Sequence, residues 1–280
     1  MPEKTLTNWQ SAAAEIQIDG RAFLNGQRLD SLSGKTRPTL NPATGKKIAE
    51  VAYCDANDAD QAVKIARATF VSGVWAGMAP ADRKMVLVRW AELIESHADE
   101  IALLETLDVG KPITDTLNID VSATVRTIRW SGEAIDKVYD EIAPTPSDCL
   151  ALVTRVPLGV VTAIVPWNFP LSTTAWKLAP SLATGNSVIL KPATNTPLSA
   201  LRVAELATEA GLPEGVLQVL PGSGSSLGKH LALHMDVDGL TFTGSTLVGK
   251  RLMEYSGQSN LKRTFLELGG KSPNIVFADC

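Results

Sequence analysis

A series of short apolar runs in the second half of this chain constrains the fold more than any other feature of the sequence. Helix-like segments separate the runs, for example Ala200 to Ala210, which Gly211 would cap. Strands that are buried on both faces and alternate with helices form parallel sheets with helices on either side. The pattern therefore predicts an α/β fold with a doubly wound parallel sheet. Its predicted strands are Val160–Val165, Val188–Leu190, Val216–Leu220 and Leu240–Phe242.

The first part of the chain is dominated by helical spacing instead. Apolar residues recur at helical intervals from Asp58 to Phe70, and a longer helix is predicted from Pro80 to a stop at Gly110. One face of that helix carries Val88, Ala91, Ile94, Ala98, Ile101 and Leu104. Residues 23–26, with the sequence Phe-Leu-Asn-Gly, favour a small hairpin before these helices.

A different pattern lies between the two parts. Pro144 and Pro146 interrupt the helical spacing, and the residues from Cys149 to Val156 alternate between apolar and polar. Such alternation is typical of a strand with one exposed face. We interpret this segment as a protruding β arm.

Composition and charge exclude several classes of function. The formal net charge of the 280 residues is −4, and Lys and Arg are scattered, so no basic face is available for nucleic acid. The first residues lack the apolar core of a secretory signal, and the longest apolar run is far shorter than the roughly 18 residues of a membrane span. Three widely spaced cysteines suit reduced thiols. We therefore expect a cytoplasmic protein without nucleic acid or membrane partners.

The residues that follow the predicted strands deserve the closest reading, because ligands of doubly wound sheets bind at the carboxyl ends of the strands. One glycine-rich turn after a strand is explained equally well as a simple tight turn. Here five motifs occur in order, and together they favour a nucleotide site. They are PWNFP (166–170), LKPA (190–193), GSGSSLG (222–228), FTGST (242–246) and LELGGK (266–271).

These motifs, with ELGGKSPNIVF (267–277), resemble those of the aldehyde dehydrogenase superfamily, and the resemblance covers essentially the whole chain. Within it the chain is most similar to the γ-glutamyl-γ-aminobutyraldehyde dehydrogenases of putrescine breakdown, through LLETLDVGKPI (103–113), IRWSGEAIDKVYDE (128–141) and GKSPNIVFADC (270–280). The resemblance implies a Rossmann-like cofactor domain in two parts, residues 1–138 and 158–267. It also implies an oligomerisation arm at 139–157 and the start of a catalytic domain at 268–280.

The resemblance implies that NAD or NADP binds at the strand ends. The glycines at 222, 224 and 228 let backbone approach a dinucleotide closely, but their spacing differs by one residue from G-x-G-x-x-G. The helix that begins near Ser245 is therefore the better anion site, and by resemblance the Ser245 hydroxyl contacts the pyrophosphate. The implied cofactor-binding residues are Val165, Pro166, Trp167, Lys191, Thr194, Gly224, Gly228, Phe242, Gly244, Ser245 and Leu268.

Two of these residues bear on affinity and cofactor choice. By resemblance Lys191 contacts the adenosine ribose hydroxyls; the alternative is a lysine that only extends from a strand end into solvent. Members of the family that prefer NAD usually carry Glu where this chain has Thr194, and that carboxylate repels a 2′-phosphate. We therefore expect NADP to be accepted at least comparably to NAD.

The resemblance also assigns catalytic residues. Asn168, between two prolines, would donate to a developing oxyanion, although an Asn here could instead cap a helix that begins near Leu171. Glu267, followed by two glycines, would be the general base, and the alternative is a surface Glu at a strand edge. Phe169 and Trp176 resemble residues that line the substrate tunnel of the family.

The nucleophile is the missing part of this chemistry. The family requires a cysteine roughly 35 residues beyond Glu267, whereas Cys280 lies only thirteen residues beyond it, next to a predicted strand at 274–278. Cys54 and Cys149 are expected to be inert thiols. Two hypotheses follow: a piece of a working dehydrogenase that is inactive alone, or a non-catalytic module that binds cofactor and forms oligomers.

The remaining expectations concern partners and metals. The substrate implied by the resemblance is an ω-amino or γ-glutamylamino aldehyde, with betaine aldehyde as the runner-up, and a dimer or tetramer would form through the arm. His230 and His234 are four residues apart on a predicted helix and could share a metal. Because the sequence indicates no third ligand, we interpret the pair as a solvated helix face and predict no metal site.

Overall fold

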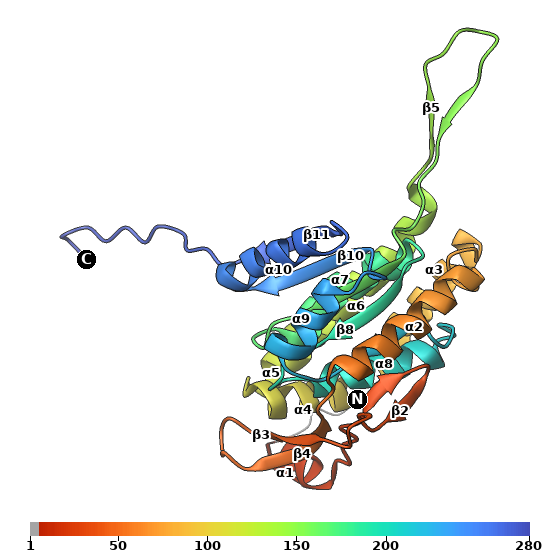
Figure 1. Ribbon diagram of the computed structural model, residues 1–280. Coiled ribbons are helices and arrows are strands. Elements are labelled where there is room, and N and C mark those ends of the chain that lie inside the picture. Colours follow the sequence, from red (N-terminus) through yellow and green to blue (C-terminus); the bar gives the residue numbers. More distant parts are fainter. Residues whose placement is uncertain (1–5) are drawn as a thin grey trace.

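The computed structural model describes residues 6–280, which form a seven-stranded sheet with helices on both faces (Figure 1). The strand order is β11-β10-β7-β8-β9-β1-β2. The strands from β7 to β11 are parallel to their neighbours, whereas β1 pairs antiparallel with β9 and β2. The predicted doubly wound parallel sheet and the small hairpin, which extends it, are confirmed. The strands are β1 (Ala22–Leu24), β2 (Gln27–Leu29), β7 (Val160–Ile164), β8 (Ser187–Lys191), β9 (Leu217–Val219), β10 (Gly239–Gly244) and β11 (Arg263–Leu268).

Helices cover both faces of the sheet because alternate side chains of each strand point in opposite directions. On one face, Val188 and Leu190 join a large core with α7 and α8, and α3, α4 and α6 lie outside this layer. On the other face, Ile189 packs in a core with α2 and α9. The helices are α1 (Leu6–Glu15), α2 (Ala56–Ser72), α3 (Pro80–Ser96), α4 (Ala98–Val109), α5 (Ile113–Asp115), α6 (Ser122–Ala134), α7 (Pro170–Ala183), α8 (Leu198–Glu209), α9 (Lys229–Leu233) and α10 (Thr246–Gln258), with shorter turns η1 (Thr116–Val121), η2 (Ile135–Lys137) and η3 (Gly224–Gly228).

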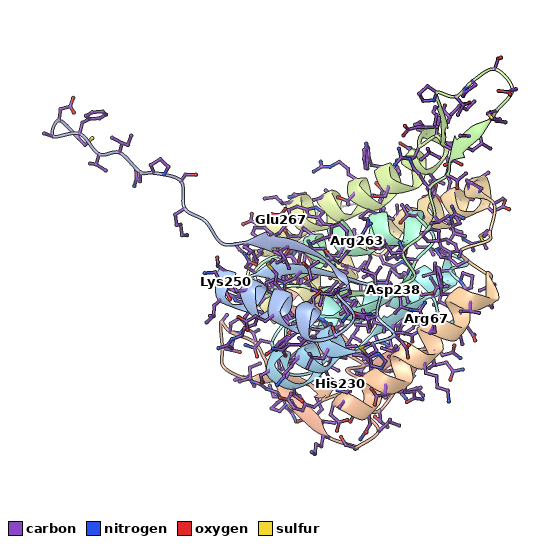
Figure 2. All side chains as sticks on the ribbon, turned by 45° about the horizontal axis from the view of Figure 1, so that its top comes forward. Arg67, His230, Asp238, Lys250, Arg263 and Glu267 are labelled. Atoms are coloured by element: carbon purple, nitrogen blue, oxygen red, sulfur yellow. The ribbon has the colours of Figure 1, made fainter. Side chains whose placement is uncertain are left out.

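Local sequence explains where α2 begins and ends. The side chain of Asp55 accepts a hydrogen bond from the backbone N–H of Asn57, and the Asp58 side chain accepts one from the backbone of Asp55, so the first turn has side-chain caps. Gly73 ends the helix in the left-handed region, with φ of 75°. In the second half of α2, Arg67 forms an ion pair with Asp238, which ties the helix to the loop before β10 (Figure 2).

The prediction of one long helix from Pro80 to Gly110 was wrong. The structure divides it into α3 and α4 at His97. The hydroxyl of Ser96 and Nδ1 of His97 both bond to the carbonyl oxygen of Leu93, at 2.8 Å each, and this local competition for a helix carbonyl favours a break. After this break, α4 packs against α8, and its acidic residues Glu105 and Asp108 are buried.

Two tryptophans fix the outer helical layer. Trp75 and Trp90 are almost fully buried, and their indole N–H groups donate to the carbonyl oxygens of Leu182 and Val203. A buried indole requires such a partner. Trp130 is exposed on α6 instead, so it belongs to the surface of the described chain.

The predicted arm is an antiparallel hairpin that projects from the body (Figure 1). Its strands are β5 (Glu141–Ala143) and β6 (Ala151–Val153). Arg155 secures the base, because its guanidinium bonds to the Glu141 carboxylate at 2.7 Å. The apolar side chains of Ile142 and Leu152 remain exposed. A second separate hairpin, β3 (Thr36–Leu40) with β4 (Lys47–Ala52), lies at the opposite end.

Residues 274–278, which were predicted to be the first strand of a following domain, do not form a strand in the described structure. The chain beyond β11 leads away from the body as an extended segment (Figure 1), and Ile275, Val276 and Phe277 are each about 70% exposed. A strand requires a partner for its backbone groups, and none pairs with these residues in the described structure. Among the described residues, no helix combines the length and the apolar character that crossing a membrane requires.

Candidate cofactor and catalytic site at the carboxyl ends of the strands

The strand order of the sheet reverses between β7 and β10. The chain passes from β7 to β8 and β9 on one side, and then returns to add β10 and β11 on the other side of β7. In open α/β sheets, ligands bind where the strand order reverses in this way. The predicted residues from Val165 to Phe169 follow β7, and Ser245 follows β10, so the topology brings them to the same edge.

Lys191 is the most unusual residue at this edge. Its side chain is 3% exposed, and within the described chain its Nζ donates a single hydrogen bond, to the carbonyl oxygen of the adjacent Pro192 at 2.6 Å. Burial lowers the pKa of Lys191 to about 8. The alternative interpretation, in which Lys191 extends from the strand end into solvent, is therefore wrong. A buried amine with unused N–H donors, at the edge of the sheet where ligands bind, is suited to donate hydrogen bonds to the hydroxyl groups of a ligand.

The glycine-rich turn lies directly beside Lys191. A Cβ on Gly228 would lie 3.4 Å from Cδ of Lys191, whereas a Cβ on Gly224 would meet nothing within 4 Å. Gly222 has another role, because its Cβ would lie 2.6 Å from the carbonyl oxygen of Cys54. The turn therefore combines one glycine that packs on the protein with one that faces open space. Thr194 joins the two loops by donating to the carbonyl oxygen of Gly222 at 3.1 Å.

The glycine-rich turn leads into a short and irregular helical segment. Residues 224–228 form the π-type turn η3, and only five residues of α9 follow. Glycines and serines have low helix propensity, which explains the irregular start. The longer α10 begins after β10, and the Ser245 hydroxyl accepts from the backbone N–H of Val248 at 3.3 Å as its N-cap. The prediction that a helix begins near Ser245 is confirmed.

Residues of β10 and β11 complete this side. Thr243 pairs in register with Glu267, and Gly244 with Leu268. The hydroxyl of Thr243 is buried without a hydrogen-bond partner in the described chain. A Cβ on Gly244 would overlap the Phe242 ring. An orphaned hydroxyl, an under-bonded amine and a glycine that faces open space, Gly224, fit a dinucleotide, which offers many acceptors and needs close backbone approach.

The Asn168 turn precedes α7 and is exposed. The capping alternative for Asn168 was wrong, because Phe169 is the N-cap residue and no side chain within the turn caps the helix. Asn168 has no hydrogen-bond partner among the described residues, so its amide is free to donate to a ligand. The residues predicted to line a substrate tunnel, Phe169 and Trp176, are also exposed, beside this turn and on α7.

A buried acid on α4 replaces the missing cap. Glu105 accepts from the backbone N–H of Leu171 at 3.2 Å and from the Ser199 hydroxyl at 2.6 Å. Burial raises the pKa of Glu105 to about 7, and the two hydrogen bonds oppose that rise. Lys111 supports the same turn, because its Nζ lies 3.4 Å from the centroid of the Phe169 ring and 2.8 Å from Asp120. These supports were not predicted from the sequence, because Glu105 and Lys111 lie far along the chain from Leu171 and Phe169.

Glu267 lies at the end of β11, where the C-terminal residues leave the body (Figure 2). It is exposed, as a carboxylate that must reach a ligand would be. Lys177 of α7, which is 8% exposed, also lies within its electrostatic reach. Burial lowers the pKa of Lys177, and the charge of Glu267 opposes this effect. The sequence analysis missed Lys177, although a lysine inside the apolar helix sequence AWKLAPSLA is a recognisable signal.

The three cysteines have different surroundings, since one is buried and two are exposed. The backbone of Cys54 pairs with that of Gly222 in an isolated β-bridge, beside the glycine-rich turn. Its thiol is buried, and this burial, together with the nearby charges of Asp58 and Asp55, raises the pKa of the thiol far above the usual range. A thiol that stays protonated is inert. Cys149 is exposed in the arm and Cys280 in the extended C-terminal segment.

Known proteins are similar to this chain over almost its whole length. The profile of the aldehyde dehydrogenase family matches residues 29–280. The NADP/NAD-dependent aldehyde dehydrogenase PuuC of Escherichia coli K12 is 52% identical over 275 residues, which are 98% of this chain and 56% of that protein.

Two solved structures superpose on this chain over almost its whole length. A γ-glutamyl-γ-aminobutyraldehyde dehydrogenase of Burkholderia cenocepacia superposes with a TM-score of 0.96 at 55% identity, over 99% of this chain and 56% of the other. An indole-3-acetaldehyde dehydrogenase of P. syringae, in complex with NAD⁺ and IAA, has a TM-score of 0.96 at 57% identity with the same coverage. The chain thus spans a little over half of the length of these proteins.

Proposed function

The chain belongs to the aldehyde dehydrogenase family, and on this premise we propose that residues 1–280 are the cofactor-binding part of an enzyme that oxidises an aldehyde to a carboxylic acid. NAD is bound in a solved relative, and the cofactor of this chain is NAD or NADP. The observation that carries the proposal is Lys191, a buried amine with one backbone acceptor at the carboxyl end of β8, the strand next to β7.

Each residue has a proposed task. When bound, NAD(P) supplies the acceptor for a hydride. Lys191 donates to the ribose hydroxyls, and the N-terminus of α10 with Ser245 holds the pyrophosphate. The Asn168 amide donates to the oxygen of the reacting carbonyl, and Glu267 accepts a proton at its carboxylate. Glu105 and Lys111 hold the Asn168 turn in place.

We propose an ω-amino or γ-glutamylamino aldehyde as the substrate of the whole protein, supported by PuuC and the Burkholderia cenocepacia relative. The P. syringae relative favours indole-3-acetaldehyde as a second candidate. Betaine aldehyde is a weaker alternative within the same substrate class.

The polypeptide of residues 1–280 should not oxidise these aldehydes at a measurable rate, because no cysteine with a reactive environment lies at the strand ends. Loss of a covalent nucleophile costs on the order of 10⁶-fold in rate. The assay follows NAD(P)H absorbance with γ-aminobutyraldehyde and indole-3-acetaldehyde, with Cys280→Ala as the matched variant. Turnover that Cys280→Ala abolishes would make Cys280 the nucleophile and overturn this proposal.

The reading frame that follows the codon for Cys280 separates the two classes of function. A continuation that carries a cysteine within a Gly-Gln-x-Cys segment supports the dehydrogenase, and a protein with that continuation should discriminate between the two aldehydes by kcat/KM. A natural stop codon there would favour a non-catalytic module that binds cofactor.

We also propose that the hairpin of β5 and β6 joins subunits into a dimer or tetramer, and that the protein is cytoplasmic. The exposed Ile142 and Leu152 support a partner strand or surface at the arm. Deletion of residues 139–157 should reduce the sedimentation coefficient to that of a monomer. An unchanged oligomer in ultracentrifugation would disprove this role of the arm.

A further inference from the structure

Two histidines and one aspartate converge on the surface between α2 and α9. Nε2 of His230 lies 2.5 Å from Oδ1 of Asp60, and Nε2 of His234 lies 3.4 Å from the same oxygen. His230 is labelled in Figure 2. The sequence indicated no third ligand for the two histidines because Asp60 is 170 residues away from His230 along the chain. The structure supplies that third ligand.

From this cluster we infer a binding site for a divalent transition-metal ion of the Zn²⁺ class, held by Asp60, His230 and His234. One ligand atom from each residue lies within 4.8 Å of the others. In a tetrahedral zinc site with bonds of about 2.0–2.1 Å, neighbouring ligand atoms are about 3.3 Å apart. The separation between His234 and Asp60 already matches this value, and that between His230 and Asp60 must open by less than about 1 Å.

The three side chains are able to make this adjustment and remain accessible. The Asp60 side chain is 56% exposed, and among the described residues it has no ion pair with Lys or Arg. The two imidazoles lie at 74° to each other, so their ring nitrogens approach the carboxylate from different directions. Exposure on one side leaves room for water as a fourth ligand.

Ligand chemistry selects the ion. Two imidazoles with one carboxylate suit Zn²⁺, Co²⁺ or Ni²⁺, whereas Mg²⁺ and Ca²⁺ prefer oxygen donors alone. One feature weakens the site: the backbone N–H of Asp236 donates to Nδ1 of His234 at 3.1 Å. Metal binding at Nε2 requires a proton on Nδ1, so this hydrogen bond must be given up. We therefore expect a dissociation constant on the order of 10 μM, weaker than in four-ligand structural sites.

A bound ion would link two elements that meet beside the cofactor turn. Asp60 lies on α2, His230 lies on α9, and His234 follows α9 directly. Because η3 runs without interruption into α9, the ion would anchor the end of the glycine-rich turn to α2. The inference is independent of the proposed function, since it rests on residues outside the strand ends.

The test is calorimetric titration of the untagged 280-residue polypeptide with Zn²⁺, in a Cys149→Ser and Cys280→Ser background. These substitutions remove the exposed thiols that would bind zinc elsewhere. We expect one ion per chain and a rise in Tm of about 2 °C at 100 μM Zn²⁺. Mg²⁺ at the same concentration should leave the Tm unchanged.

Matched variants decide whether the cluster is responsible. His230→Ala and His234→Ala should each weaken zinc binding at least tenfold, while His97→Ala, which changes the remaining histidine, should not. Thermal denaturation in the presence of EDTA establishes whether each variant is folded without metal. If His230→Ala is not folded, His230→Gln takes its place. The visible spectrum of bound Co²⁺ should lack thiolate charge-transfer bands. Zinc binding that survives both histidine variants, or that His97→Ala weakens equally, would overturn the inference.

Discussion

Two buried lysines lie in different regions of this molecule, and their surroundings differ in one instructive respect. Burial lowers the pKa of both Lys191 and Lys262 to about 8. Lys262 donates to the carbonyl oxygen of Ala232 at 2.6 Å and to the Ser259 hydroxyl at 2.8 Å. Among the described residues, Lys191 donates only to the carbonyl oxygen of its neighbour, Pro192. A buried amine whose donors are satisfied within the fold is structural, whereas one with unused donors at a strand end indicates a ligand.

The largest effect in this comparison should come from Lys262→Met. The substitution removes two charge-assisted hydrogen bonds and leaves the Ala232 carbonyl without this partner, so we expect the free energy of unfolding to fall by about 1–3 kcal/mol. Lys191→Met keeps a similar volume, removes a buried charge and should change stability by less than about 1 kcal/mol. Urea denaturation measures both variants. Equal losses in the two would contradict the distinction between them.

A change of pH should alter the stability of the protein through both lysines. It should alter the affinity for the cofactor through Lys191 alone. Each folded pKa of about 8 lies below the ordinary value of 10.5, so between these values the unfolded chain holds more protons. Stability should therefore rise with pH across this window, by up to about 1.4 kcal/mol per unit for each lysine. Cofactor affinity should instead fall by up to about tenfold per unit above pH 8, because the ammonium is lost.

The comparison of variants across that pH range sharpens this prediction. Each Met variant should flatten part of the rise in stability, as thermal denaturation between pH 8 and 10 would reveal. Only Lys191→Met should remove the pH dependence of cofactor affinity. A dependence that persists in Lys191→Met would assign it to another group.

The smallest effect should follow from Thr194→Glu. A carboxylate three residues after Lys191 would repel a 2′-phosphate and accept bonds from ribose hydroxyls, so the affinity ratio of NAD to NADP should rise about tenfold. The substitution also removes the hydrogen bond from Thr194 to Gly222, and Thr194→Val provides the control for that loss. In the unchanged chain, a preference for NAD above a hundredfold in binding titrations would contradict the expected acceptance of NADP.

The sequence allowed much of the sheet to be predicted because its strands are buried on both faces and are therefore apolar throughout. It also located the strand-end motifs, including the start of α10 at Ser245. The break at His97 was not predicted, because it depends on two side chains that compete for one carbonyl within a continuous helical pattern. Residues 274–278 form no strand in the described structure, because apolar sequence alone does not supply a pairing partner.

The site was predictable only in part, for a related reason. Lys191 and Asn168 lie within recognisable motifs, but the residues that support them come from distant segments. Glu105 reaches the first turn of α7 from α4, and Lys111 reaches Phe169 from the loop after α4. Such contacts depend on how helices pack, which periodicity alone does not specify.

The most direct test of this account is titration of the 280-residue polypeptide with NAD⁺ and NADP⁺, comparing the unchanged chain with Lys191→Met and Lys262→Met. Binding can be followed by calorimetry at pH 7, where both lysines are protonated. We expect saturable binding of one cofactor per chain. Lys191→Met should weaken it by about 10- to 100-fold, the value of one or two charge-assisted hydrogen bonds, and folded Lys262→Met should not weaken it. Unchanged affinity in Lys191→Met, or no binding by the folded unchanged chain, would contradict the account.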